Sequence, residues 1–218
     1  MNKAYKFRLY PDSEQEVLIN KTFGCVRFIY NKMLGDKTAY YEETKNNLKV
    51  TPAQYKQEFE WLKEVDSLAL ANAQLNLQTA YNNFFRDVKI GFPKFKSKHR
   101  DRNSYTTNNV NGSIRIEGKQ IRLPKLGLVN VKFHRQVPSE YAIKSCTISK
   151  SPTGKYYISI LVEYEAEIPQ PIIDIDSILG LDMDMKNLFT DSQGNRAEYP
   201  RCYRQMQDKL AREQRKLS

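Results

Sequence analysis

Two aspartates, Asp182 and Asp184, are the residues whose types and spacing could do chemistry. They follow the apolar run 178–181, which predicts a short buried strand. Residues two apart in a strand point to the same side, so both carboxylates could face one metal ion. Carboxylate-bound Mg²⁺ can cut a phosphodiester. Solvated or structural carboxylates show the same spacing more often, so the rest of the chain must decide.

The residues that follow extend this pattern. Leu188-Phe189 predicts a second strand, and 191–194 predicts a turn with Gly194 at positive φ. Residues 196–198 are expected to pair back as a hairpin, and an amphipathic helix begins near Tyr203. This order of a strand, a carboxylate, a second strand and a tight turn resembles the start of a ribonuclease-H-like nuclease domain.

Composition limits the classes of function. The chain has 218 residues and a net charge of +10, which favours a polyanionic partner, nucleic acid before membrane. It has no run of 18 apolar residues and no apolar signal region, so we expect a cytoplasmic protein that does not span a membrane. Its three cysteines form no Cys-x-x-Cys pair, so we expect no zinc. Two distant histidines exclude a His-x-His site.

The positive charge is concentrated in one region. Residues 86–144 hold fourteen Lys or Arg against four Asp or Glu, an excess equal to the net charge of the whole chain. Within it, the stretch 91–102 alternates basic residues with Phe92 and Phe95. Such cations can neutralise phosphates, and such rings can stack on bases. The candidate contacts are Lys94, Lys96, Lys98, Arg100 and Arg102.

Helices are predicted between residues 13 and 88. Ser13 and Glu16 form a candidate capping box, and an apolar stripe continues to Met33. Gly24-Cys25 interrupts the stripe, so this is one helix or two. Two packed helices are favoured over a DNA-binding helix-turn-helix. Thr51-Pro52 predicts a second start, leading to a buried Trp61-Leu62. Asp66-Ser67 caps a third helix, whose apolar stripe runs from Leu70 to Val88.

The third helix also carries an amide-rich side that is almost uncharged. Asn72, Gln74 and Gln78 belong to it, and such amides can read adenine edges in a major groove. A merely solvated polar side is the slightly favoured alternative.

From Ser104 the apolar period changes to two. Six short strands are predicted, at 104–110, 113–117, 120–123, 128–133, 143–149 and 156–164. They suggest a small barrel or curved sheet that the alternating strand 4–10 joins, with the helices as an insertion. The fold class is therefore α+β. Residues 163–176 are acidic and contain two prolines, which is typical of a linker.

The order of these parts resembles a known family. The blocks that carry the resemblance are Gly24-Cys-Val-Arg-Phe-Ile-Tyr-Asn31, Ala80-Tyr-Asn-Asn-Phe-Phe-Arg86, Gly91-Phe-Pro-Lys-Phe-Lys96, Tyr105-Thr-Thr-Asn-Asn109, Ile121-Arg-Leu-Pro-Lys-Leu-Gly127, Leu179-Gly-Leu-Asp-Met-Asp-Met-Lys-Asn-Leu188 and Tyr199-Pro-Arg201. Together they resemble the TnpB (OrfB) proteins of bacterial insertion sequences, relatives of compact type V CRISPR effectors.

The resemblance implies a wedge-type antiparallel β-barrel with a helical recognition insertion, followed by a RuvC nuclease domain. The implied boundaries are 1–12 for the first barrel strand, 13–100 for the insertion, 101–168 for the rest of the barrel and 169–218 for the start of RuvC. Asp182 matches the first catalytic carboxylate and would help to hold Mg²⁺. Tyr105 and Thr107, in a matched block, are added to the candidate nucleic-acid contacts.

Family members use a guide RNA from the transposon end to cut double-stranded target DNA. The later catalytic Glu and Asp and the zinc ribbon have no counterpart in these 218 residues. The first hypothesis is therefore an N-terminal part of such a nuclease that binds nucleic acid and does not cut alone. The alternatives are a naturally short, nuclease-dead repressor or guide-RNA holder, and a basic domain that binds structured RNA without a guide.

Overall fold

The structure is a computed structural model that describes residues 1–165 and 178–217. The chain divides into two compact units, 1–166 and 167–218, which are described separately. The elements of the first unit are β1 Asn2–Tyr10, α1 Ser13–Thr44, α2 Pro52–Glu58, η1 Glu60–Lys63, α3 Ser67–Arg86, η2 Val88–Ile90, β2 Asn103–Asn108, β3 Arg115–Glu117, β4 Gln120–Leu123, β5 Gly127–Lys132, β6 Ala142–Lys150 and β7 Tyr156–Glu163.

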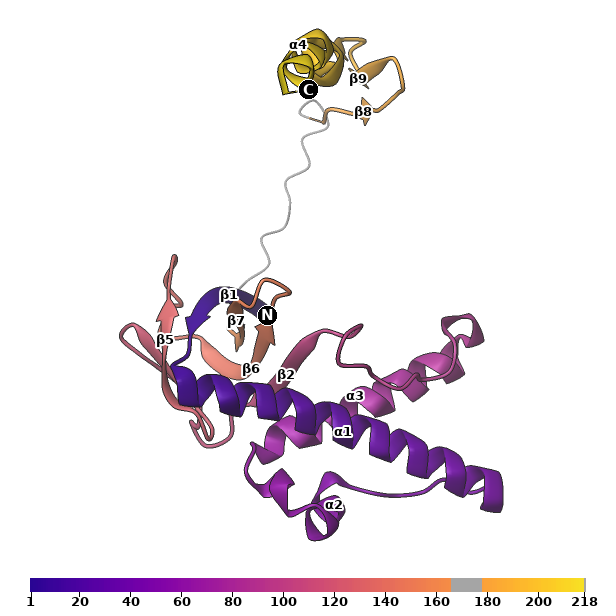
Figure 1. Ribbon diagram of the computed structural model, residues 1–218, viewed down its shortest axis with the longest axis vertical. Coiled ribbons are helices and arrows are strands. Elements are labelled where there is room, and N and C mark those ends of the chain that lie inside the picture. The colour runs from indigo at the N-terminus through magenta and orange to yellow at the C-terminus, as the bar shows by residue number, and fades with distance from the viewer. Residues whose placement is uncertain (166–177, 218) are drawn as a thin grey trace. The chain divides into compact units, whose positions relative to one another are not determined.

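All seven strands of this unit form one antiparallel, curled sheet in the order β2-β6-β7-β1-β5-β4-β3 (Figure 1). The first strand joins the six later ones, as predicted, and lies at the centre. Tyr5, Phe7 and Leu9 alternate along it and are buried, because one face of the sheet packs on the core.

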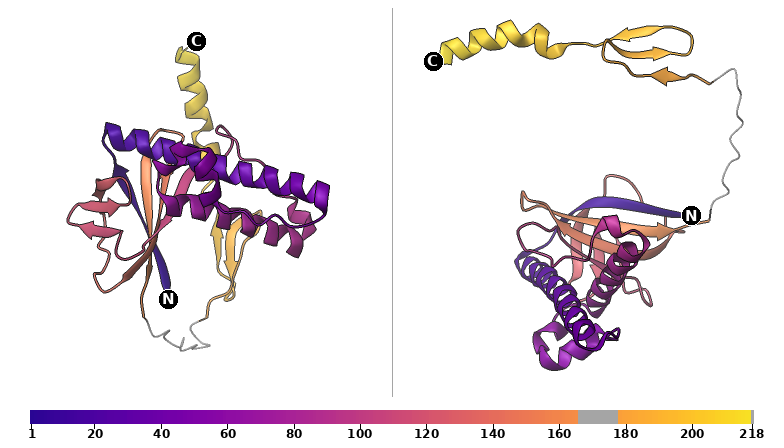
Figure 2. Two further views of the ribbon diagram at one scale, coloured as in Figure 1. Left: turned by 90° about the horizontal axis from the view of Figure 1, so that it is seen from below. Right: turned by 90° about the vertical axis from the view of Figure 1, so that its right-hand side faces the viewer.

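The curved sheet, one of the two predicted arrangements, is confirmed, and the sheet does not close into the barrel. Its edge strands, β2 and β3, are not hydrogen-bonded to each other. Instead α1 and α3 pack together and both contact β2 (Figure 2). This edge is therefore covered by helices, which protects its backbone as barrel closure would.

The helix α1 is one uninterrupted helix of 32 residues, so the two-helix interpretation of Gly24-Cys25 is wrong. Buried side chains lie on both sides of Gly24, from Ile19 to Leu34, and packing holds the helix straight through the glycine.

The capping box of α1 also differs from the prediction by one residue. Asp12 is the N-cap, and its Oδ1 accepts from the Gln15 amide at 2.8 Å. Asp12 N in turn donates to Gln15 Oε1 at 3.1 Å. The Gln15 Nε2 donates to the carbonyls of Leu126 and Leu128, which neither Ser13 nor Glu16 does in this structure. These two hydrogen bonds to a distant part of the chain favour Asp12 over Ser13 as the N-cap of α1.

The other helices begin as predicted. Pro52 opens α2, and Asp66 caps α3 by accepting from Leu68 N. Two side chains expected in the core are exposed: Trp61 at 37%, with its ring edge against Phe28, and Val88 at 69%. The α3 stripe therefore ends before Val88, because the helix itself stops at Arg86. None of the described helices is long and apolar enough to cross a membrane.

The second unit contains β8 Leu181–Asp182, β9 Asn187–Asp191, β10 Arg196–Glu198 and α4 Cys202–Leu217. The strands form an antiparallel sheet in the order β10-β9-β8. The predicted hairpin is confirmed, with Gly194 at φ +87° in its turn. The predicted burial of 178–181 is wrong, since Ile178, Leu179 and Leu181 are all exposed. Three short strands do not cover these side chains. The linker prediction falls largely on residues 166–176, outside the described residues.

We expect Gly24→Ala to stabilise the protein by about 0.5–1 kcal/mol, because glycine is costly inside a helix. A Cβ at Gly24 would meet no atom within 4 Å. Thermal unfolding measures the effect. Gly127→Ala is the matched control: it also has open space, but its φ of +69° disfavours a side chain, so its melting temperature should fall. A lower melting temperature for Gly24→Ala would contradict the expectation.

Candidate nucleic-acid interface

The basic stretch 91–102 runs between η2 and β2 and is fixed to α1 by one side chain. Asn31 Oδ1 accepts from the Lys96 backbone N at 2.7 Å, and Asn31 Nδ2 donates to the Lys96 carbonyl at 2.9 Å. The Lys96 ammonium lies 4.1 Å from the centre of the Tyr30 ring. Burial lowers the pKa of Lys96, an effect that Asp101 partly opposes. Lys96 is therefore an anchor of the loop rather than a free phosphate ligand.

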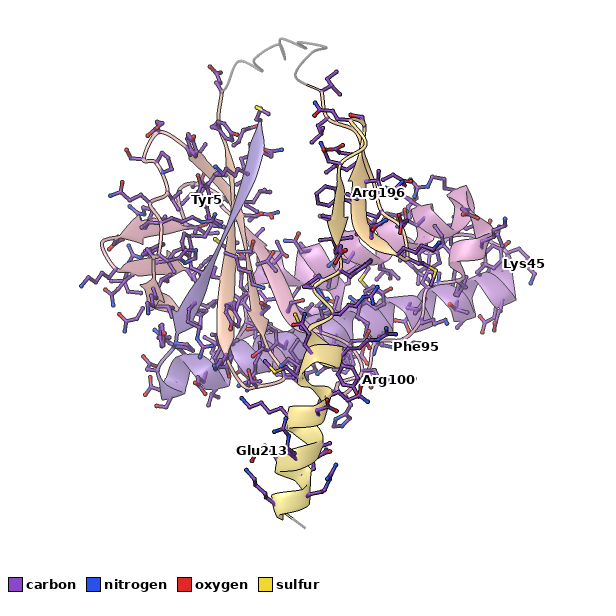
Figure 3. The ribbon with its side chains drawn as sticks, turned by 90° about the horizontal axis from the view of Figure 1, so that it is seen from above. Tyr5, Lys45, Phe95, Arg100, Arg196 and Glu213 are labelled. Atoms are coloured by element: carbon purple, nitrogen blue, oxygen red, sulfur yellow. The ribbon has the colours of Figure 1, made fainter. Side chains whose placement is uncertain are left out.

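The next residues form a tight turn that turns cations outward. Ser97 N donates to Asp101 Oδ2 at 2.5 Å, and Asp101 N donates to the Ser97 carbonyl at 3.1 Å. Four of the predicted contacts are exposed: Lys94, Lys98, Arg100 and Arg102. Figure 3 shows Phe95 and Arg100 with their side chains on this loop. The loop therefore presents cations that a polyanion can reach.

Aromatic side chains accompany these cations. Phe95 is 62% exposed and lies beside Gly35 of α1. Phe92 is half exposed. Its ring lies edge-to-face with the rings of Tyr81 and Phe84, with centroid separations of 5.6 and 5.5 Å. The predicted alternation of cations and rings is thus present on the surface, where rings can stack on unpaired bases.

A small cavity of about 80 Å³ lies between α1, α3, this loop and β2. Its walls include the cations Arg27, Lys96 and Arg102, one carboxylate, Asp101, and the amides of Asn72 and Asn76. The remaining walls are Phe23, Val26, Ala69, Ser104, Tyr105 and Thr106. The volume suits a few waters or the edge of one group, not a whole nucleotide.

The predicted amide side of α3 is divided in the structure. Asn72 lines the cavity, and its Nδ2 donates to the Leu68 carbonyl at 2.9 Å. Gln74 Nε2 donates to the Val50 carbonyl at 3.4 Å, and Gln78 Nε2 donates to Asn82 Oδ1 at 3.0 Å. At 3.6 residues per turn, Gln74 and Gln78 lie on the other flank of the buried line through Ala73 and Leu77. The three amides therefore do not form one recognition surface.

Tyr105 and Thr107 are not accessible contacts. They are 6% and 1% exposed, because alternate residues of β2 face the core. Thr107 Oγ1 donates to Asp66 Oδ2 at 2.5 Å, and burial beside Asp66 raises the pKa of Tyr105. Ser104 and Thr106 line the cavity together with the buried Tyr105, whereas Thr107 does not. The prediction chose the wrong parity of the strand.

Asp182 lies in a separate hollow of the second unit, lined by residues 180–182 and 190–192. Asp184 does not share it as a second ligand. Its carboxylate accepts from Lys186 N, Asn187 N and Asn187 Nδ2, and these bonds lower its pKa. Asp191 is likewise bound to Gln193 and Asn195. Asp182 is thus the carboxylate of this hollow with no hydrogen-bond partner among the described residues.

Comparison with known proteins identifies the family. Residues 1–46 match the model of the helix-turn-helix domain of OrfB proteins of IS605-type elements. A Streptomyces pristinaespiralis protein, named as a candidate RNA-guided DNA endonuclease, is 30% identical across 100% of this chain and 55% of its own length. InsQ of Escherichia coli K12, named in the same way, is 33% identical across 99% of this chain and 54% of its own length. The chain belongs to the OrfB (TnpB) family.

This OrfB-family chain spans about half the length of these two relatives. A solved structure is titled as a Cas12f1–sgRNA–target DNA complex. Its match covers 100% of this chain and 62% of the Cas12f1 chain, with 12% sequence identity and a TM-score of 0.38. The family model is described as a helix-turn-helix domain, but its residues 1–46 here form β1 and the single helix α1.

The sequence-based prediction omitted Arg27, Ser104 and Thr106, and it placed Asn76 on the amide-rich side of the third helix without naming it as a contact. Arg27 Nη1 donates to Asn103 Oδ1 at 3.3 Å, across 76 positions of the chain. Only the i, i+4 spacing of Asn72 and Asn76 was available as a local signal.

Replacing Asn31 by Ala should release the loop, because both hydrogen bonds to the Lys96 backbone are lost. We expect the free energy of unfolding to fall by about 1–3 kcal/mol and the Lys96 amide to exchange faster. Amide hydrogen exchange measures this directly. Asn46→Ala, which removes an exposed amide after α1, should leave Lys96 protected. Unchanged exchange at Lys96 in Asn31→Ala would show that the loop is held by other contacts.

Proposed function

We propose that the first unit binds nucleic acid through the loop 91–102 and the cavity beside it. The observation that carries the proposal is the cluster of exposed cations and rings that Asn31 holds against α1. Exposed Lys and Arg replace the counterions of phosphates, and exposed rings accept unpaired bases. The cavity adds the amides of Asn72 and Asn76. Its size suits the edge of one base, and amides can form hydrogen bonds with such an edge.

The partners proposed for this surface are a guide RNA from the transposon end and a double-stranded target DNA. The names of the curated relatives support this choice, because both are called RNA-guided DNA endonucleases. A repressor or guide-RNA holder that acts by occupancy would use the same surface. RNA sequencing of co-purified nucleic acid separates the repressor from the two roles that need a guide RNA. A defined RNA from one transposon end favours the guided nuclease or the guide holder.

We further propose that the second unit is the start of a RuvC-like domain and that Asp182 is its first metal-binding carboxylate. Two antiparallel strand pairings followed by a helix support this, as does the unpartnered Asp182 carboxylate in its hollow. Mg²⁺ would supply activation of a water and stabilisation of phosphate charge. The described residues contain no group of three or more His, Cys, Asp or Glu side chains that could hold a metal ion together. Asp182 would be one ligand of such a site, which the described residues do not form alone.

The triple variant Lys94→Gln/Lys98→Gln/Arg100→Gln should weaken nucleic-acid binding and make it less sensitive to salt. Each lost phosphate contact should reduce the slope of log K against log salt by about 0.7–0.9. Fluorescence anisotropy across a salt titration measures both quantities. The charge-matched control is Lys49→Gln/Lys63→Gln/Lys155→Gln, which changes exposed cations outside the loop. Binding that equals the parent protein at every salt concentration would refute the interface.

Asp182→Ala should leave both the fold and nucleic-acid binding intact, because its carboxylate makes no hydrogen bond among the described residues. Asp191→Ala is the comparison variant: it removes three hydrogen bonds from the β9–β10 turn and should destabilise the second unit. Circular dichroism and anisotropy report the two properties. A collapse of the fold in Asp182→Ala would show that Asp182 is structural.

A further inference from the structure

The sheet has a second positively charged surface, on the face opposite the core. Lys6 and Arg8 of β1 alternate with the buried Tyr5, Phe7 and Leu9. The same alternation places Lys132 of β5, Arg122 of β4 and Arg115 of β3 on this face. We call these five cations the sheet-face cations. They lie outside the loop 91–102, and β1 is separated from β2 by β6 and β7.

The register brings like charges directly opposite each other. Arg8 is the cross-strand partner of Lys132, and Arg115 is the partner of Arg122. Like charges in such pairs destabilise a sheet. Glu117, on edge strand β3, is the carboxylate nearest in register, and Glu163 of β7 is bound to Lys144. Within residues 1–165 and 178–217, no carboxylate forms an ion pair with any of the sheet-face cations. The free protein therefore carries an uncompensated repulsion here.

Arg8 lies at the side of this surface that adjoins β7. Its guanidinium lies over the rings of Tyr10 and Tyr157, at 5.4 and 5.2 Å, and the Lys6 ammonium lies 5.1 Å from Tyr157. The rings hold both cations in place. Arg8 Nε is the buried side-chain polar atom of the described residues that has no hydrogen-bond partner. A buried guanidinium N–H without an acceptor is costly, so a bound anion that pairs with the rest of this partly exposed guanidinium would offset part of that cost.

We propose that the sheet-face cations, Arg8 among them, bind the phosphodiester backbone of a folded nucleic acid at a second site. Cations two residues apart on a strand are separated by about 6.8 Å, and the directly opposed pair Arg8 and Lys132 by about 4.8 Å. Arg122 is paired with Leu128, so the Arg115–Arg122 pair lies four residues farther along β5 than Lys132, roughly 14 Å away. A single small anion compensates one pair, whereas a chain of phosphates compensates several at once. Ser159, the cross-strand partner of Lys6, adds a hydroxyl that can donate to phosphate or sugar oxygens.

The proposal does not depend on the loop 91–102, so the two sites can be tested separately. The test variant is Lys132→Gln/Arg122→Gln in the full chain, since both side chains are exposed and neither lies over a ring. The control is Lys49→Gln/Lys155→Gln. The probes are a mixed-sequence hairpin RNA and the hairpin DNA of the same sequence, measured by anisotropy in a salt titration.

We expect the affinity of the test variant to fall several-fold and its salt slope to fall by about 1 per residue, with no change in the control. Its melting temperature should be equal to or above that of the parent, because repulsion is relieved. A merely structural role would lower the melting temperature instead. Loss with RNA alone assigns the site to RNA, and loss with both hairpins assigns it to the shared backbone.

Three results would overturn the proposal. The first is affinity equal to the parent with both hairpins at every salt concentration. The second is equal competition by polyglutamate at matched charge, which would indicate an acidic protein partner. The third is a melting temperature well below that of the parent. If the loop variant weakens binding and the sheet-face variant does not, the interface at 91–102 stands and this second site is refuted.

Discussion

The candidate interface depends on the pair of hydrogen bonds between the Asn31 side chain and the Lys96 backbone. The loop has no helix or strand of its own at this point, and its cations repel one another. An amide side chain can satisfy both backbone groups of one residue, which a carboxylate or a hydroxyl cannot do as well. The far end of α1 is fixed in a similar way, since Gln15 donates to two carbonyls beside β5. A single rigid helix thus connects the sheet to the loop.

A buried carboxylate, Asp66, connects α3 of the helical insertion to β2 of the sheet. Asp66 caps α3 with one oxygen and accepts from Thr107 of β2 with the other. Both oxygens have a partner, so burial of the charge is tolerated. The helices that bring Arg27 and Asn72 to the cavity are therefore held at the same strand that carries Ser104 and Thr106. The insertion and the sheet behave as one scaffold for the site.

Local patterns predicted the elements because alternation and helical stripes are imposed by neighbours in the chain. All seven strands, the starts of α2 and α3 and the Gly194 turn follow from such patterns. The errors arise where two local solutions are nearly equal and a distant contact decides. Ser13 and Asp12 both head plausible capping boxes, and Gln15 selects Asp12 by reaching β5. The parity of β2 and the juxtaposition of Arg27 with the loop likewise depend on contacts across tens of residues.

Counting charge along the chain found the region 86–144 and could not find the surface around Arg8. That surface exists only once β1 pairs with β5, which places residue 8 opposite residue 132. Its repulsion costs stability in the free protein, and the same repulsion is what a bound polyanion relieves. Any ligand that binds only the folded state stabilises it by mass action. The same like-charge pairs therefore lower the stability of the free protein and increase the free energy gained when a polyanion binds.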